Sequence, residues 1–88
     1  MKYRSRTDIV AEILESANSG VTKTKIMYKA FLSYTQLQEY VSLLIENGLL
    51  EYHPHNQTYK TTTKGNHFMK IYERMGGYIT SPAKAAKF

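Results

Sequence analysis

The chain has 88 residues, enough for one small domain and too few for two cores or a large enzyme cleft. Its 12 Lys and Arg against 7 Asp and Glu give a net charge of +5, which favours polyanionic partners, nucleic acid first and an acidic membrane surface second. The absence of cysteine excludes disulfides and thiolate zinc sites. Asp8 and Glu12 interrupt the stretch after the basic start, and no apolar run reaches membrane-spanning length. We therefore expect a soluble, intracellular protein without a membrane partner.

The first helix is expected to begin between Ser5 and Asp8. Ser5 and Asp8 have the spacing of a capping arrangement, and Thr7 is a competing N-cap. Apolar residues then recur at helical spacing up to the segment Asn18-Ser19-Gly20, which ends the helix: Ile9, Val10, Ile13, Leu14 and Ala17. This spacing predicts a helix that supports the core.

A second helix is predicted from Lys23 to about Ala30. Val21 before it is expected to form a strand of one or two residues, and Thr22 to act as the N-cap. Ile26 and Met27 face inward in this interpretation. The lysines of the helix are then left to solvent or phosphate, namely Lys23, Lys25 and Lys29.

The third helix starts at a capping box, in which Ser33 and Gln36 exchange side-chain and backbone hydrogen bonds. Leu32 and Leu37 are placed as a hydrophobic staple. The predicted buried stripe continues along Leu37, Val41, Leu44 and Ile45, and Asn47-Gly48 ends the helix. The outer positions form a candidate reading surface: Tyr34, Thr35, Gln38, Glu39 and Ser42.

Two short β runs, Leu50 to His53 and Thr58 to Thr61, flank the turn Pro54-His55-Asn56-Gln57 and predict a hairpin. Thr62 can cap a last helix from Thr63 to about Met75, and Gly76-Gly77 is expected to end it. Its apolar residues fall on one face: Phe68, Ile71, Tyr72 and Met75. Residues 78–88 lack the apolar surface for a core, so we expect a flexible basic tail there.

The order of these elements predicts an α+β fold, a single winged helix-turn-helix domain spanning residues 1–77. It would have a three-helix core, a β-hairpin wing and a C-terminal helix. In such modules the second helix of the helix-turn-helix commonly enters the DNA major groove. The expected partner is therefore double-stranded DNA.

Four motifs carry a family resemblance: Lys25-Ile-Met-Tyr-Lys, Leu32-Ser-Tyr-x-Gln-Leu, Asn47-Gly-Leu and Thr62-x-Lys-Gly. With them, residues 5 to 75 resemble archaeal winged-helix proteins of the predicted transcriptional regulator type, and most closely their small chromatin-associated branch. This resemblance implies a cytoplasmic, nucleoid-associated DNA-binding protein. It also implies a homodimer through the last helix, with Phe68, Ile71, Tyr72 and Met75 as the dimerisation residues.

The expected DNA contacts divide into phosphate and base contacts. Phosphate contacts are assigned to cations at the periphery and to the wing: Lys23, Lys25, Lys29, Lys60 and Lys64, the arm residues Lys2, Arg4 and Arg6, and His55, Asn56 and Gln57. Ser33, Tyr34, Thr35, Gln36 and Gln38 lie at the start of the reading helix. Thr35 and Gln38 are the better base readers, because Gln36 also serves the capping box. The reading helix is net acidic, so binding is expected to depend on these peripheral cations. Because Arg, the strongest reader of guanine, is absent from this helix, we expect low to moderate specificity, and a specific regulator and an architectural binder both remain open.

Other interpretations remain beside this one. Tyr28, Tyr40, Tyr52 and Tyr72 are expected in the core or a dimer interface. Glu51, His53 and His55, with His67, offer potential metal ligands, but we expect no metal and no cofactor. No catalytic constellation is present, so we do not expect an enzyme. The alternative functions are a protein-interaction winged helix and a ligand- or metal-responsive repressor.

Overall fold

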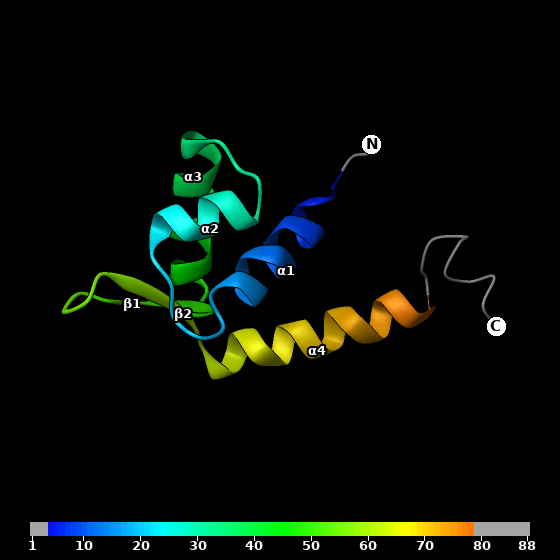
Figure 1. Cartoon of the computed structure of the whole chain (residues 1–88). Coiled ribbons are helices and arrows are strands. Elements are labelled where there is room, and N and C mark those ends of the chain that lie inside the picture. Colours follow the sequence, from blue (N-terminus) through cyan, green and yellow to red (C-terminus); the bar gives the residue numbers. More distant parts are fainter. Residues whose placement is uncertain (1–3, 79–88) are drawn as a thin grey trace.

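Four helices and one β-hairpin make up the part of the chain that the computed structural model describes, residues 4–78 (Figure 1). The elements are α1 (Arg6–Ser16), α2 (Lys23–Lys29), α3 (Tyr34–Glu46), β1 (Leu50–His53), β2 (Thr58–Thr61) and α4 (Thr63–Tyr78). The hairpin and the far end of α4 point in opposite directions. The predicted α+β winged helix-turn-helix architecture is confirmed.

Side-chain caps fix the helix starts. Ser5 Oγ accepts from Asp8 N at 3.0 Å while Ser5 N donates to Asp8 Oδ2 at 3.1 Å, so Ser5 and not Thr7 caps α1. The predicted box at Ser33 and Gln36 is present at the start of α3. Each box satisfies backbone N–H groups that the first helical turn leaves unpaired.

The core lies between the first three helices and the start of β1. Its fully buried large side chains are Ile13, Leu14, Ile26, Leu37, Leu44 and Leu50. The predicted stripe of α3 is wrong at one position, because Ile45 is 41 % exposed and Tyr40, only 8 % exposed, is buried instead. The buried arc follows positions i, i+3, i+4 and i+7 from Leu37, so Ile45 falls at its edge.

The predicted hairpin has the expected bounds, and Leu50 pairs with Thr61 in antiparallel register. Val21 forms an isolated bridge with Tyr59, with backbone N···O distances of 2.9 and 2.7 Å in the two directions. The buried Thr61 donates through Oγ1 to the carbonyl of Leu14 at 2.6 Å. The wing is thus attached at its base to α1 and to the segment before α2.

The expected end of the last helix is wrong, because α4 continues through Gly76-Gly77 to Tyr78. A glycine inside a helix costs about 1 kcal/mol relative to alanine but does not forbid the conformation. The first half of α4 packs on the core through Phe68 and Met69. Residues 79–88, most of the predicted tail, lie outside the described residues.

In the part of the chain from residue 4 to residue 78, no helix is both long enough and apolar enough to cross a membrane.

Candidate nucleic-acid interface

The exposed side of α3 is held in place by the buried side of the same helix. Leu37 and Leu44 are buried, and this leaves Tyr34, Thr35 and Gln38 exposed along the first turns. These three are the predicted reading residues of the helix start, and the structure places all of them at the surface. A helix that is fixed by its core face can present such a surface without rearrangement.

Gln36 is committed to the capping box. Its Oε1 accepts from Ser33 N at 3.0 Å, and Ser33 Oγ accepts from Gln36 N at 3.2 Å. Bidentate recognition of adenine requires both the oxygen and the nitrogen of the amide. Gln36 and Ser33 are therefore poor base readers, as the capping argument led us to expect.

Lys23 links α2 to the exposed side of α3. Its Nζ donates to Gln38 Oε1 at 2.9 Å and lies 6.0 Å from the centre of the Tyr34 ring. The contact uses one of the two lone pairs of the Gln38 amide oxygen, so recognition of adenine through both amide atoms has to use the other lone pair together with the amide nitrogen. Sequence reasoning placed these residues on one interface but did not reveal their direct contact.

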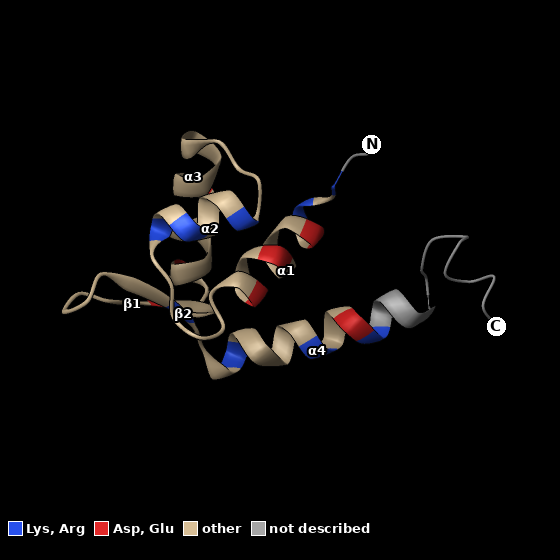
Figure 2. Cartoon of the chain, viewed as in Figure 1, with Lys and Arg blue, Asp and Glu red and all other residues tan. Residues whose placement is uncertain are grey.

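Figure 2 shows basic positions along α2 and none that are acidic. Among them, Lys25 and Lys29 are exposed. Lys29 lines a hollow of about 360 Å³ together with Glu12 and Glu15 of α1, so acidic groups lie near it. Lys25 does not line that hollow. We therefore expect Lys25 to act on a distant phosphate more strongly than Lys29.

The two arm arginines are folded onto the domain. Arg4 forms an ion pair with Glu12 and donates to the carbonyls of Ala30 at 2.6 Å and Phe31 at 3.1 Å. Arg6 lies 5.5 Å from the centre of the Tyr40 ring. Both were predicted as phosphate contacts of the N-terminal arm, and in the structure Arg4 holds the turn after α2. Lys2 lies outside the described residues.

The tip of the wing presents His55, Asn56 and Gln57, all of them exposed. Asn56 Oδ1 accepts from Thr58 Oγ1 at 2.7 Å, and Gln57 has a φ of 55°. Lys60 is exposed but donates to the carbonyl of Asn18 at 3.0 Å. The predicted wing residues thus lie at the surface, with Lys60 held at the base.

A hollow of about 400 Å³ lies between α2 and the wing, and sequence reasoning missed it. Tyr52 and Tyr59 face each other across the strands, with ring centres 4.8 Å apart. The strand register is the signal that could have revealed the pairing of Tyr52 with Tyr59, because directly paired residues share one face of a hairpin. Tyr52 and Tyr28 were expected in the core or a dimer interface, and both are exposed in this chain. The lining residues are Thr22, Lys23, Thr24, Tyr52, Gln57 and Tyr59.

The histidines do not gather into a metal site. Within residues 4–78, no group of three or more His, Asp or Glu side chains is arranged to hold a metal ion. His53 Nε2 contacts Glu51 Oε2 at 2.7 Å, and the His53 and His55 rings are 6.1 Å apart. His67 lines a separate groove on α4.

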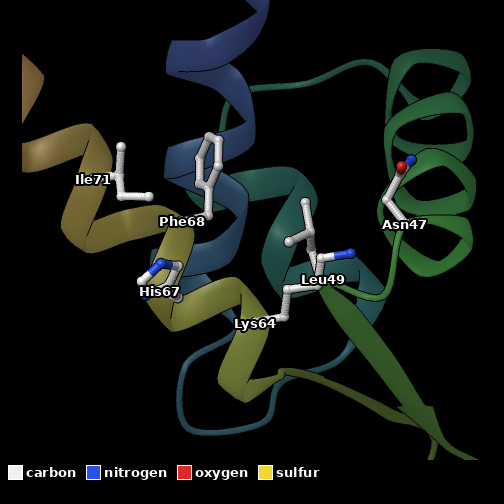
Figure 3. A pocket seen from close by; sticks show the side chains of 6 residues that line it. All are labelled: Asn47, Leu49, Lys64, His67, Phe68 and Ile71. Carbon is white, nitrogen blue, oxygen red and sulfur yellow. The ribbon is translucent and has the colours of Figure 1, made fainter.

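That groove, between α4 and the segment that links α3 to β1, has a volume of about 330 Å³ (Figure 3). Its lining is mostly apolar and includes two of the predicted dimerisation residues, Phe68 and Ile71. A third, Tyr72, donates instead to Asp8 Oδ1 of α1. The fourth, Met75, is not among the residues whose side chains the structure describes. The groove is lined by Asn47, Leu49, Lys64, His67, Phe68 and Ile71.

Comparison with known proteins agrees with this architecture. The crystal structure of Sso10a-2, a DNA-binding protein from Sulfolobus solfataricus, is similar with a TM-score of 0.81 and 23 % sequence identity, covering 96 % of this chain and 90 % of that one. No curated protein sequence matches this chain. The family model for the winged helix-turn-helix matches residues 3–79, nearly the whole chain. The chain therefore belongs to the winged helix-turn-helix family.

Proposed function

We propose that this protein binds duplex DNA, with the start of α3 in the major groove and α2 and the wing against the backbone. The observation that carries the proposal is the contact of Lys23 with both Gln38 and Tyr34, which joins the cationic helix to the exposed side of α3. The fold similarity to Sso10a-2, described as a DNA-binding protein, supports it. Such a protein acts in the cytoplasm, associated with the nucleoid.

The proposed interface has more phosphate contacts than base contacts. Lys25 and the hollow between α2 and the wing, with its lysine, hydroxyl and amide groups, suit a sugar-phosphate strand. Thr35 and Gln38 are the base readers, and α3 contains no Lys or Arg while Glu39 and Glu46 are exposed on it. Because Arg, the usual reader of guanine, is absent, we propose low to moderate sequence specificity. This favours an architectural binder over a regulator of a few sites.

We propose further that the protein is a homodimer through α4. Ile71 is 44 % exposed beside the apolar groove that also contains Phe68 and Leu49 (Figure 3). A second copy of α4 would cover this surface. A dimer would present two copies of α3 to successive turns of the duplex.

The test is fluorescence anisotropy of a labelled random-sequence duplex at several salt concentrations. The double variant Lys25→Ala/Lys29→Ala should weaken binding to every sequence, and the slope of log K against log salt should become shallower by up to about two. Lys70→Ala/Arg74→Ala is the matched control, because it removes two exposed charges from α4 and should leave the slope unchanged. If the wild-type protein fails to bind at low salt, the proposal is wrong. Equal slopes for both double variants would remove α2 from the interface.

A further inference from the structure

Two helices of this chain end in the same backbone motif, but with different residues at its critical position. At the end of α3, Gly48 N donates to Ile45 O and Leu49 N to Leu44 O, which is a Schellman motif with Gly48 at φ 73°. At the end of α2, Phe31 N donates to Tyr28 O and Leu32 N to Met27 O in the same pattern. Phe31 takes the glycine position, with φ 54°.

A left-handed conformation is unfavourable for phenylalanine, and the turn around it is tightly constrained. Ala30 and Leu32, on either side of Phe31, are buried. Arg4 donates to the carbonyls of both Ala30 and Phe31. The surrounding structure therefore determines the backbone here, as is typical where strain persists at functional positions.

The Phe31 side chain gains little from the fold in return. It is 81 % exposed, the highest value among the large apolar side chains of the described residues. Glycine would relieve the backbone strain and remove an exposed aromatic ring. A single exposed ring is ordinary, whereas several exposed rings close in the chain indicate a contact with another molecule.

Phe31 is one of three exposed aromatic residues that are spaced three residues apart in the sequence. Tyr28 at the end of α2 is 71 % exposed and Tyr34 at the start of α3 is 60 % exposed. Residues 16–38, which contain all three, carry three lysines and no Asp or Glu. Three lysines and three exposed rings thus lie interspersed between Lys23 and Tyr34.

The charges near these rings come from two helices. Lys23 lies over the Tyr34 ring, and Lys29 is two residues before Phe31. On α1, Glu12 is paired with Arg4, and Glu15 shares the hollow with Lys29. Arg4, which donates to the carbonyl of Phe31, and Lys29 are thus offset by Glu12 and Glu15, so the positive charge near Phe31 is partly compensated.

We propose that Tyr28, Phe31 and Tyr34 form a stacking surface for unpaired bases, so that the protein also binds single-stranded nucleic acid. Single-strand binders combine aromatic side chains that stack on successive bases with cations that follow the backbone. Both components are present here within twelve residues, from Lys23 to Tyr34. The lysines are shared with the duplex-binding surface, but the stacking does not depend on α3 entering a major groove.

The charge pattern favours nucleic acid over a protein partner for this surface. A protein that accepted Phe31 in an apolar pocket would need acidic groups opposite the lysines of α2. A single strand supplies phosphates for the lysines and apolar base faces for the rings in one ligand. A single strand is therefore the ligand that fits the rings and the lysines of this surface together.

The test measures binding of a labelled 20-nucleotide oligothymidine (a length of about one or two site sizes) by Phe31→Ala and by Phe31→Trp. Alanine has a Cβ, as phenylalanine does, so the cost of the left-handed backbone stays the same and the fold should be unaffected. The substitution removes only the ring. We expect Phe31→Ala to weaken oligothymidine binding about 5- to 140-fold, the effect of losing one stacked base. The salt slope should stay unchanged, because stacking releases no counterions. Phe31→Trp should bind as tightly as the wild type or more tightly.

Ile45→Ala is the matched control, because it truncates an exposed apolar residue at the other end of α3 and should bind normally. Duplex binding is measured in parallel to separate the two proposals. Duplex binding without oligothymidine binding would overturn the stacking surface alone, and oligothymidine binding without duplex binding would overturn the proposed function alone. Equal oligothymidine affinity of Phe31→Ala and wild type would also reject stacking and would leave a protein partner for the exposed rings.

Discussion

Phe31 gives a stability prediction that is separate from any ligand. Relief of its left-handed backbone strain in Phe31→Gly should raise the free energy of unfolding by about 1 kcal/mol. Urea unfolding followed by circular dichroism measures the change. Gly48→Ala is the reciprocal control and should lower stability by about 1 kcal/mol, because an added Cβ would meet only the Lys64 side chain at 3.7 Å and the remaining cost is the φ of 73°. A loss of stability in Phe31→Gly would show that the ring is held by contacts of its own.

The contact between Asp8 and Tyr72 makes stability depend on pH at both ends of the scale. The hydrogen bond from Tyr72, followed by that from the Ser5 backbone, lowers the pKa of Asp8 below its ordinary value. The same contact raises the pKa of Tyr72 to about 12. A lowered carboxyl pKa gives stability that is present above the unfolded pKa near 4 and is lost as the pH falls. A raised tyrosine pKa gives stability that is present below about pH 10 and is lost as the pH rises through 12.

We therefore expect Tyr72→Phe to lower the urea midpoint at neutral pH. The difference from the wild type should shrink below about pH 4 and again between about pH 10 and 12. Tyr28→Phe, at an exposed tyrosine of α2, is the control and should show no such window. A pH-independent difference for Tyr72→Phe would mean that ring packing, and not the hydrogen bond, is the contribution of Tyr72.

At the scale of elements, Gly65 explains how α4 approaches the wing. A Cβ at this position would lie 2.4 Å from the carbonyl oxygen of Leu49 and 2.6 Å from the Thr61 methyl group. One of these neighbours is backbone, so the first turn of α4 would have to move. Gly65→Ala should therefore destabilise the protein by about 1–3 kcal/mol, despite the better helix propensity of alanine. Gly48→Ala again provides a comparison, because it meets no backbone atom. A stable Gly65→Ala protein would show that α4 can shift at its start without disturbing the core.

The sequence predicted elements well where the signal is local. The strand bounds follow from the turn at Pro54 to Gln57, and the start of α3 follows from Ser33 and Gln36, three residues apart. Ile45 was predicted to be buried because the spacing of apolar residues alone does not locate the centre of the buried face of α3. Tyr40 is part of that face, and Ile45 lies at its edge. The end of α4 was misplaced because paired glycines weaken a helix by an amount that its other residues can outweigh.

The sites could be predicted only in part, because their contacts join distant parts of the chain. Arg4 reaches Ala30 and Phe31 across 26 and 27 residues, and Tyr72 reaches Asp8 across 64. Composition and spacing identify Arg4 as a cation but not as a clamp on the turn after α2. The left-handed Phe31 likewise has no sequence signal, because glycine is the residue that marks such a position.

At the scale of the whole molecule, the proposed dimer is tested at Ile71. This residue is exposed on α4 beside the apolar groove, so Ile71→Glu should leave the fold intact and place a charge in the contact with a second α4. We expect sedimentation to show a shift from dimer to monomer at a given concentration. Ile45→Glu, a similarly exposed residue on α3, should leave the dimer unchanged. Because two linked copies of α3 bind with higher avidity than one, the Ile71→Glu protein should also lose affinity for long duplexes more than for duplexes that hold a single copy. If Ile71→Glu remained a dimer and lost the same affinity for long and for short duplexes, the dimer contact would lie elsewhere than on α4.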